Sequence, residues 1–377
     1  MPRAAYVHVP FCLHKCGYCD FTVLAGHDDL ADSYLEAISR ELATLGQPHE
    51  VDTLFIGGGT PTHLTVPQLK QLTALLRRWL PLAPGGEWSI EANPYELVAR
   101  DDGRDLLDAL RAAGLTRVSL GVQSVDAAVL KTLERTHSPE QVHEAISRVG
   151  DRFATWSVDL IFGVPGQTLA SWEQTLDEVI ARQPPHVSAY GLTFEKGTAF
   201  WSRLHHGDLV RTPDETERAM QAAAMDRLPA AGLRQYELSN FARPGHRCRH
   251  NETYWAAGDF FGFGPGAASL VDGVRRTNHR SARTYLKRIL SGESPVMETE
   301  PLSTDTIARE RIMLGLRRID GLPLDGFERV VGRSLDDFAP GVSEKMQARG
   351  WVTVDTERLT LTREGRFVAD EVIAAFF

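Results

Sequence analysis

Apolar residues recur in two alternating patterns along the first two thirds of the chain. Short runs rich in β-branched and aromatic residues predict strands at 4–9, 51–56, 88–93, 117–124, 155–163, 186–192 and 233–240. Apolar residues spaced three and four apart predict helices at 30–45, 66–80, 105–114, 126–134, 139–149, 171–182 and 214–231. Because strands and helices of this length alternate, we expect an α/β protein with βαβ units and a parallel sheet. At least six units fit, which favours a barrel, or a large part of one, over a smaller doubly wound sheet.

The pattern changes after residue 240. Residues 241–285 are rich in Gly, aromatic residues and His and show no helical period, so we expect an irregular functional segment there. Residues 301–377 predict three helices, the third over 335–349, then a two-strand hairpin around Asp355–Arg358 and a closing helix, which is typical of a winged helix. Its basic residues are interspersed with acidic ones, which favours a packing module over a DNA-binding one. The expected divisions are 1–240, 241–300 and 301–377.

Composition and charge narrow the class of protein. Of the 377 residues, 42% are hydrophobic and 24% charged, as in soluble globular proteins, and the net charge of −9 provides no attraction for nucleic acid. No apolar run approaches the roughly 20 residues that span a bilayer. The N-terminal residues contain one Arg and no long apolar segment, unlike a secretory signal. We therefore expect a cytoplasmic protein without transmembrane segments.

Three of the four cysteines are clustered. Cys12, Cys16 and Cys19 lie within eight residues directly after the first predicted strand, and Cys248 is far away. In a reducing compartment, clustered thiols more often bind a metal or a cluster than form disulfides. Three protein ligands leave one coordination position open, as in reactive sites. The spacing alone allows either zinc, with His14 as the nearest fourth ligand, or an iron–sulfur cluster.

Polar residues also mark the ends of several predicted strands. The strand 51–56 ends in a glycine-rich run, 57–62, where the backbone can approach a ligand closely. Glu91, Gln123 and Asp159 lie in otherwise apolar strands. Buried carboxylates need partners, so these residues form either ion pairs within the barrel wall or part of a ligand site. Functional groups of a parallel barrel lie at the C-terminal ends of its strands, which favours the ligand site.

The Cx3Cx2C motif after a first barrel strand resembles the radical S-adenosylmethionine superfamily. The resemblance implies a partial (β/α)6 TIM-like barrel in which Cys12, Cys16 and Cys19 bind a 4Fe-4S cluster. S-adenosylmethionine would chelate the fourth iron and yield a 5′-deoxyadenosyl radical. Tyr18 within the motif also fits the family pattern. The residues that match family contacts to S-adenosylmethionine are Tyr6, Gly58, Gly59, Thr60, Glu91, Gln123, Arg135, Asp159, Gly191 and Ala268.

Longer motifs narrow the resemblance within this superfamily. YVHVPFC, GGGTPT, SIEANP, GVQS, DLIFGVPGQT and YELSNFA are similar to those of oxygen-independent coproporphyrinogen III oxidases and of the related heme chaperones. The oxidases carry a further Cys where this sequence has Phe21, and an N-terminal extension that we expect to be absent here. The run from His250 to Trp255 matches the HNxxYW motif of the chaperone branch. All three features favour the chaperones.

The chaperone resemblance implies that the protein binds heme and passes it to acceptor proteins, with membrane-bound respiratory proteins among the candidates. An oxidase of porphyrin biosynthesis is the first alternative. A zinc-dependent winged-helix regulator is the second, which the negative charge and the βα pattern disfavour.

The HNxxYW segment is the candidate heme site. His250 can ligate heme iron axially. Alternatively, His250 is buried in a loop core with aromatic residues packed around it, and Cys248 is a second candidate ligand or a plain buried thiol. The apolar faces for a porphyrin would come from Tyr254, Trp255, Phe260, Phe261 and Phe263, and the cations for its propionates from Arg247, Arg249, Arg275 and Arg276.

Overall fold

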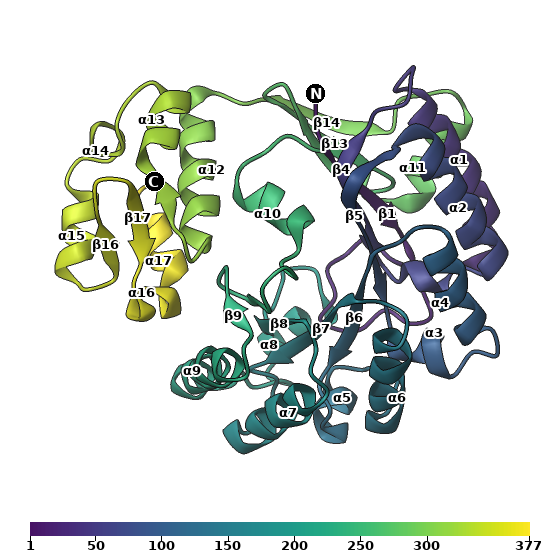
Figure 1. The fold of residues 1–377 in the computed structure, drawn as a ribbon, viewed down its shortest axis with the longest axis horizontal. Coiled ribbons are helices and arrows are strands. Elements are labelled where there is room, and N and C mark those ends of the chain that lie inside the picture. The colour runs from purple at the N-terminus through teal and green to yellow at the C-terminus, as the bar shows by residue number, and fades with distance from the viewer.

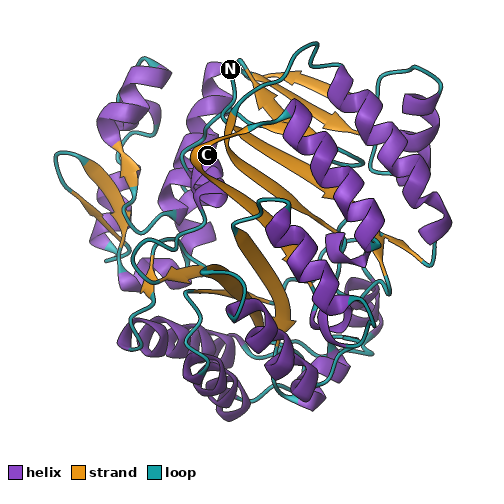
Figure 2. Cartoon of the chain, turned by 45° about the vertical axis from the view of Figure 1, so that its right-hand side comes forward, coloured by secondary structure: helices purple, strands orange, loops and turns teal.

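The computed structural model describes residues 1–377, and its centre is an open barrel formed by one nine-stranded sheet (Figures 1 and 2). The strand order is β11-β1-β4-β5-β6-β7-β8-β10-β9. Six consecutive strands are parallel: β1 (Ala4–Val9), β4 (Val51–Gly58), β5 (Leu82–Ala92), β6 (Arg117–Gln123), β7 (Thr155–Phe162) and β8 (His186–Gly191). This arrangement confirms the predicted partial (β/α)6 barrel.

Helices cover the outer face of the sheet (Figure 2). The longer ones are α1 (Ala31–Ala43), α2 (Val66–Trp79), α4 (Gly103–Ala112), α6 (Pro139–Gly150), α7 (Leu169–Ala181) and α9 (Asp214–Ala230). The shorter ones are α3 (Pro94–Val98), α5 (Ala127–Thr132) and α8 (Ala199–His206). Capping boxes begin α2 at Thr65 and α6 at Ser138. The main hydrophobic core lies between these helices and the outward-facing residues of the strands.

The inner face of the sheet is polar. In β6, Val118, Leu120 and Val122 pack in the main core, whereas the alternate residues Arg117, Ser119, Gly121 and Gln123 line a cavity inside the barrel. Strand β7 alternates in the same way, with Val158 and Leu160 in the core and Ser157 and Asp159 at the cavity. Ordinary parallel barrels fill their interior with bulky apolar side chains, so this alternation keeps the interior open for ligands.

The chain between residues 233 and 301 differs from the sequence-based expectation. The predicted strand 233–240 is interrupted and forms β9 (Arg234–Gln235) and β10 (Asn240–Ala242). Between them, Leu238 N–H donates to Arg317 O at 3.0 Å, so the backbone pairs with the C-terminal part instead of the sheet. The expected irregular segment contains α10 (Arg249–Trp255), β11 (Phe261–Phe263), β12 (Ala268–Val271), β13 (Val274–Asn278), α11 (Ala282–Leu290) and β14 (Val296–Pro301). Most of these elements are too short to show a clear period.

The C-terminal part has a core of its own and the expected winged-helix-like arrangement. Its helices are α12 (Thr304–Arg317), α13 (Leu324–Val331), α14 (Leu335–Phe338), α15 (Val342–Ala348), α16 (Arg363–Phe367) and α17 (Ala369–Ala374). Its sheet contains β15 (Leu322–Pro323), β17 (Arg358–Leu361) and β16 (Val352–Val354). The predicted helix 335–349 is broken where Gly341 adopts a left-handed φ of 68°. This part lies beside α10, on the open side of the barrel (Figure 1).

Ionic contacts attach the C-terminal part to the barrel. Arg363 pairs with Asp226 at 2.8 Å, and Arg218 pairs with Glu364 at 2.8 Å. The Arg218 guanidinium also lies 4.0 Å from the centre of the Phe367 ring, a cation–π contact. These contacts place α16 against α9.

Candidate functional site

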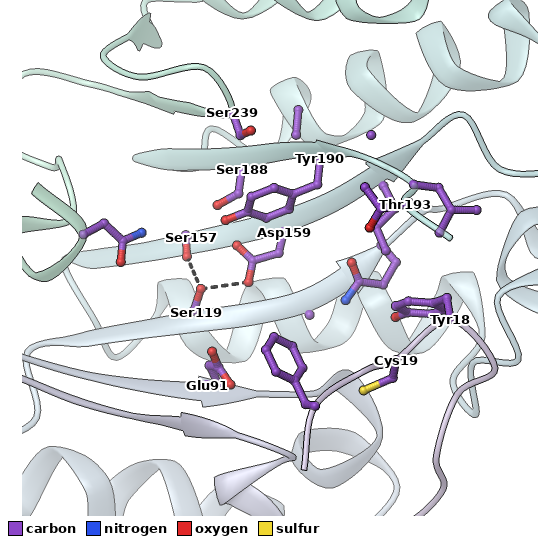
Figure 3. Close-up of a pocket in the computed structure, with 18 of the residues that line it drawn as sticks. Tyr18, Cys19, Glu91, Ser119, Ser157, Asp159, Ser188, Tyr190, Thr193 and Ser239 are labelled. Carbon is purple, nitrogen blue, oxygen red and sulfur yellow. Dashed lines mark hydrogen bonds between the residues drawn. The ribbon is translucent and has the colours of Figure 1, made fainter. Parts of the chain in front are cut away.

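A cavity of about 1130 Å³ occupies the barrel interior and reaches the C-terminal part. Figure 3 shows part of it, with Cys19 and Tyr18 on one side and inward-facing residues of the strands on the other. The predicted cluster ligands, the residues predicted to contact S-adenosylmethionine, and His250 all line this one cavity. They are Tyr6, Cys12, Cys16, Tyr18, Cys19, Gly58, Gly59, Thr60, Glu91, Gln123, Arg135, Asp159, Gly191, His250 and Ala268.

The cysteine loop connects β2 (Phe11–Cys12) with β3 (Leu24–Ala25) and is fixed from several sides. Thr60 N–H donates to Phe11 O at 2.7 Å, and the Thr60 hydroxyl lies 3.2 Å from Cys12 Sγ. Phe200 N–H, in the first turn of α8, donates to Gly17 O at 2.9 Å. A Cβ at Gly17 would come within 2.7 Å of the Phe200 ring, so the close packing of α8 on the loop requires glycine there.

The chemistry of the loop fits a cluster better than a single metal ion. Burial raises the pKa of Cys12 to about 12, so this thiol needs a metal to ionise near neutral pH. Arg135 Nη1 lies 3.6 Å from Cys16 Sγ, so a cation lies beside the second cysteine of the loop. No three His, Cys, Asp or Glu side chains converge on one ion, and His14 is directed toward Glu134 at 3.8 Å. Three thiols without a fourth protein ligand suit a cluster completed by a non-protein ligand.

Two glycines keep the space beside the cysteines open. Gly58 has a left-handed φ of 115°, and a Cβ there would lie 2.6 Å from the His8 ring. A Cβ at Gly59 would lie 2.7 Å from Phe11 O and 3.1 Å from Cys12 Sγ. Any larger residue would therefore displace the cysteine loop or the His8 ring. Gly58 N–H donates to Glu91 Oε2 at 2.9 Å, which joins this turn to β5.

Glu91 and Asp159 are carboxyl groups at the cavity that form no ion pair within 4.0 Å, so the ion-pair alternative does not hold for them. Burial raises the pKa of Glu91 to about 8 and also raises the pKa of Asp159. Asp159 accepts from the Ser119 hydroxyl at 2.8 Å (Figure 3). Both groups are thus placed to meet a cationic ligand group, which would favour the ionised form of each carboxyl.

Gln123, Arg135 and Tyr6 are each held by a specific local arrangement. Gln123 adopts a left-handed φ of 67° at the end of β6, a strained conformation for a residue other than glycine. Arg135 donates to Asn93 Oδ1 at 2.5 Å and to Gly121 O at 3.0 Å. The Tyr6 hydroxyl lies 3.1 Å from His8 Nδ1. Backbone strain at a cavity-lining side chain is typical of functional sites.

His250 is buried, and both of its ring nitrogens are occupied. Its Nδ1 lies 3.0 Å from the Thr53 hydroxyl, and its Nε2 lies 2.9 Å from the Tyr254 hydroxyl. The ring stacks on Phe55 at 5.2 Å, and the residue is only 1% exposed. Burial lowers the pKa of His250 to about 3, so the imidazole is neutral at physiological pH. The alternative of a buried histidine among aromatic rings therefore describes the present conformation.

Several expected heme contacts are corrected by the structure. Of the five aromatic residues, only Tyr254 and Phe260 line the cavity. The four arginines expected to meet propionates face elsewhere: Arg247 pairs with Glu252, Arg275 pairs with Glu300 and Glu310, Arg249 donates to Gly85 O, and Arg276 is exposed. Cys248 is a buried free thiol with its pKa raised to about 12 by burial, although it reaches the cavity wall.

Two groups of cavity residues were not predicted from the sequence. One is a set of inward-facing strand residues: Arg117, Ser119, Ser157, His186, Ser188 and Tyr190. The sequence feature that could have identified them is the alternation of polar and apolar residues along β6, β7 and β8. This alternation indicates a polar, open barrel interior and not one filled with apolar side chains. The other group lies in the C-terminal part and comprises Arg317 and residues 366–371. No motif marks this group, because only the tertiary arrangement brings it to the cavity.

Comparison with known proteins agrees with this architecture. The profile of the Radical SAM superfamily matches residues 6–179, and that of the HemN C-terminal domain matches residues 302–368. The solved structure of the coproporphyrinogen III oxidase HemN from Escherichia coli superposes with a TM-score of 0.86 and covers 100% of this chain and 90% of that chain. At 24% identity, this likeness concerns the fold. Fold and site together define a radical SAM protein.

Relatives that match over the full length identify the family within this superfamily. The chain is 36% identical to the heme chaperone HemW of Bacillus subtilis over 99% of both chains. It is 38% identical to HemW of Mycobacterium tuberculosis and 34% identical to HemW of Escherichia coli, each over at least 94% of both chains. The chain belongs to the HemW family of heme chaperones within the radical SAM superfamily. Membership in this superfamily implies a 4Fe-4S cluster and S-adenosylmethionine.

The helices of the structure differ from those that span membranes. None is both long enough and apolar enough to cross a bilayer.

Proposed function

We propose that this protein binds heme in its barrel cavity and transfers it to acceptor proteins in the cytoplasm or at the cytoplasmic membrane surface. The observation that carries the proposal is the 36% identity to a heme chaperone over 99% of both chains. The cavity of about 1130 Å³ supports it, because this volume exceeds that of most single-ligand sites. Heme and the cofactor can therefore share one chamber.

Cys12, Cys16 and Cys19 would hold the 4Fe-4S cluster, and the turn at Gly58–Thr60 with Glu91, Gln123, Arg135 and Asp159 would bind S-adenosylmethionine. When bound, the pair supplies one-electron cleavage of a sulfonium. Glu91 and Asp159 would stabilise the positive charges of the ligand, since neither carboxylate is neutralised by the protein. Tyr6, Tyr18, Gly191 and Ala268 would complete the wall.

His250 would serve as the axial ligand of the heme iron. The low pKa of its imidazole favours this role, because no proton competes with iron for the ring nitrogen at neutral pH. The Tyr254 hydroxyl must first leave Nε2, to which it is hydrogen-bonded at 2.9 Å. Tyr254 lines the cavity, so its side chain can respond to an entering ligand. The hydrogen bond therefore acts as a cap on the ligand nitrogen in the heme-free protein.

The alternative function is that of a coproporphyrinogen III oxidase, because the fold is similar to that of HemN. Phe21 argues against it. This residue occupies the position of the oxidases' additional Cys, lines the cavity and is 57% exposed. Phenylalanine supplies neither a thiol nor a metal ligand there.

The test uses one anaerobic sample of the full chain, reconstituted with iron and sulfide. We expect stoichiometric heme binding in an absorbance titration and transfer of that heme to the apo-form of a bacterial b-type heme protein. In the same sample, coproporphyrinogen III should not be converted. Formation of protoporphyrinogen IX with 5′-deoxyadenosine in proportion would establish the oxidase function instead.

A further inference from the structure

Arg117 is a buried cation without a counter-ion. It lies at the start of β6, is 1% exposed and lines the cavity. Its Nη1 donates to His246 O at 3.0 Å, and no carboxylate lies within 4.0 Å of its guanidinium. An unpaired charge in the protein interior destabilises the folded state unless another group compensates it. A position of this kind is a natural place for an anionic ligand group.

The nearest acidic side chains are directed to other partners. Glu87 accepts from the backbone N–H groups of Arg249 and His250, each at 3.1 Å, and from the Ser89 hydroxyl at 3.4 Å. Asp159 accepts from the Ser119 hydroxyl at 2.8 Å. Neither carboxylate forms an ion pair with Arg117, although the charge of Arg117 partly offsets the effect of burial on the pKa of Asp159.

Strand register brings further polar groups to the same level of the barrel. Ser119 lies opposite Ser157, and Ser157 lies opposite His186. The hydroxyls of Ser119 and Ser157 are 2.6 Å apart. His186 Nε2 is hydrogen-bonded to the Tyr236 hydroxyl at 2.9 Å, whereas its Nδ1 is buried without a partner. Arg117 lies two residues before Ser119 on the same inward face of β6.

Small side chains leave room beside these groups. Ser119, Ser157 and Ser188 lie on three adjacent strands and face the cavity, with Glu91 beside Ser119 on the neighbouring strand β5 (Figure 3). Gln123, which ends β6 at the proposed S-adenosylmethionine site, is six residues beyond Arg117, about 20 Å along a strand. Arg117 therefore lies at the opposite end of β6 from Gln123, whereas Ser119 lies beside Glu91 and Asp159 of the proposed S-adenosylmethionine site.

We propose that Arg117, Ser119, Ser157 and His186 form a subsite for a ligand carboxylate. This subsite lies inside the barrel, toward the N-terminal ends of its strands. Resting on the proposed function, that carboxylate is a heme propionate. The guanidinium supplies the charge, and the Ser157 hydroxyl supplies an adjustable donor, since the Ser119 hydroxyl already donates to Asp159. This subsite takes the role that the sequence analysis gave to four other arginines. It would orient the porphyrin with its propionate edge toward the N-terminal ends of the strands.

The test compares heme with its dimethyl ester, in which both propionates are blocked, by anaerobic absorbance titration of the cluster-loaded protein. Wild type should prefer the free acid by about 10- to 100-fold, the range for hydrogen bonds to charged groups. Arg117→Met should remove most of this preference by weakening the free acid alone. Ser157→Ala should reduce it a few-fold. Arg366→Gln is the matched control, because Arg366 lines the same cavity from the C-terminal part.

The outcomes separate this inference from the proposed function. Wild type that binds neither porphyrin contradicts both. Wild type that binds acid and ester equally overturns only the subsite. A preference that survives Arg117→Met, or that Arg366→Gln removes, also overturns it, since the carboxylate is then recognised elsewhere. If circular dichroism shows that Arg117→Met does not fold, Ser157→Ala decides: an unchanged preference rejects the subsite and a reduced one supports it.

Discussion

His250 and Tyr254 lie one turn apart on α10, and the hydroxyl of Tyr254 caps the imidazole nitrogen that faces it, Nε2, at 2.9 Å. The opposite nitrogen, Nδ1, is held by Thr53 on β4 at 3.0 Å. One side of the ring is thus anchored to the rigid sheet, while the other depends on a residue at the cavity wall. If His250 ligates the heme iron as proposed, displacement of the Tyr254 hydroxyl is the step that frees Nε2.

The first prediction concerns this pair. His250→Ala should weaken heme binding and shift the Soret band, because an axial imidazole sets the ligand field of the iron. Tyr254→Phe should bind heme faster and up to about fivefold more tightly, because one hydrogen bond of about 1 kcal/mol no longer competes. Absorbance titration and stopped-flow mixing measure both. Trp255→Phe, which alters a ring outside the cavity, serves as control. Unchanged heme spectra and affinity in His250→Ala would contradict the assignment.

The second prediction concerns the cysteines. Replacing Cys12, Cys16 or Cys19 with Ser should abolish cluster binding, since no fourth protein thiol lies in the loop to replace a lost ligand. Cys248→Ser should retain the cluster, because that thiol lies beside Glu87, at 3.6 Å. Iron and sulfide analysis after anaerobic reconstitution measures the result. Stoichiometric zinc without sulfide in the wild type would refute the cluster.

Local sequence signals were sufficient for most of the barrel and its strand ends. The cysteine spacing, the glycine turn and the isolated polar residues Glu91, Gln123 and Asp159 all converge on one cavity, because parallel strands end at one edge of the sheet. The limits of the three divisions of the chain remain a prediction.

The missed features depend on long-range packing. The strand expected over 233–240 breaks because Tyr236 and Leu238 form backbone hydrogen bonds with residues 319 and 317 of the C-terminal part. Arg366 lines the cavity because the C-terminal part packs against the barrel. No local sequence pattern predicts this packing. His250 carried a recognisable motif, but its exposure could not be inferred, since Thr53 and Tyr254 approach it only in the folded chain.

The third prediction uses the close contact between the cysteine loop and α8. Gly17→Ala would place a methyl group 2.7 Å from the Phe200 ring, so we expect a loss of about 1–3 kcal/mol in stability and lower cluster occupancy. Phe200→Leu should partly restore both in the double variant, because a narrower side chain makes room. Thermal unfolding and iron content report the two effects. A double variant no better than Gly17→Ala would show that the loop fails for another reason.

The fourth prediction concerns the pH dependence of Glu91. Burial raises its pKa from about 4.5 in the unfolded chain to about 8 in the folded protein. Between these values the folded state binds more protons than the unfolded state, so this group lowers stability progressively as pH rises from 5 to 8. Glu91→Gln cannot ionise and should escape this loss. Without S-adenosylmethionine, the melting temperature of this variant relative to wild type should therefore increase with pH. The corresponding difference in unfolding free energy is at most a few kcal/mol.

Added S-adenosylmethionine should reverse this order for Glu91. A cationic ligand group beside the carboxylate lowers its pKa and makes ionisation favourable, so the ligand should stabilise wild type more than Glu91→Gln. Calorimetric titration should show weaker binding to the variant, and the wild-type affinity should fall as the pH drops below 8 and Glu91 becomes protonated. Glu96→Gln is the comparison variant, because Glu96 is a buried glutamate that does not line the cavity. Equal affinity of wild type and Glu91→Gln across pH 6–9 would show that this carboxylate does not face the ligand.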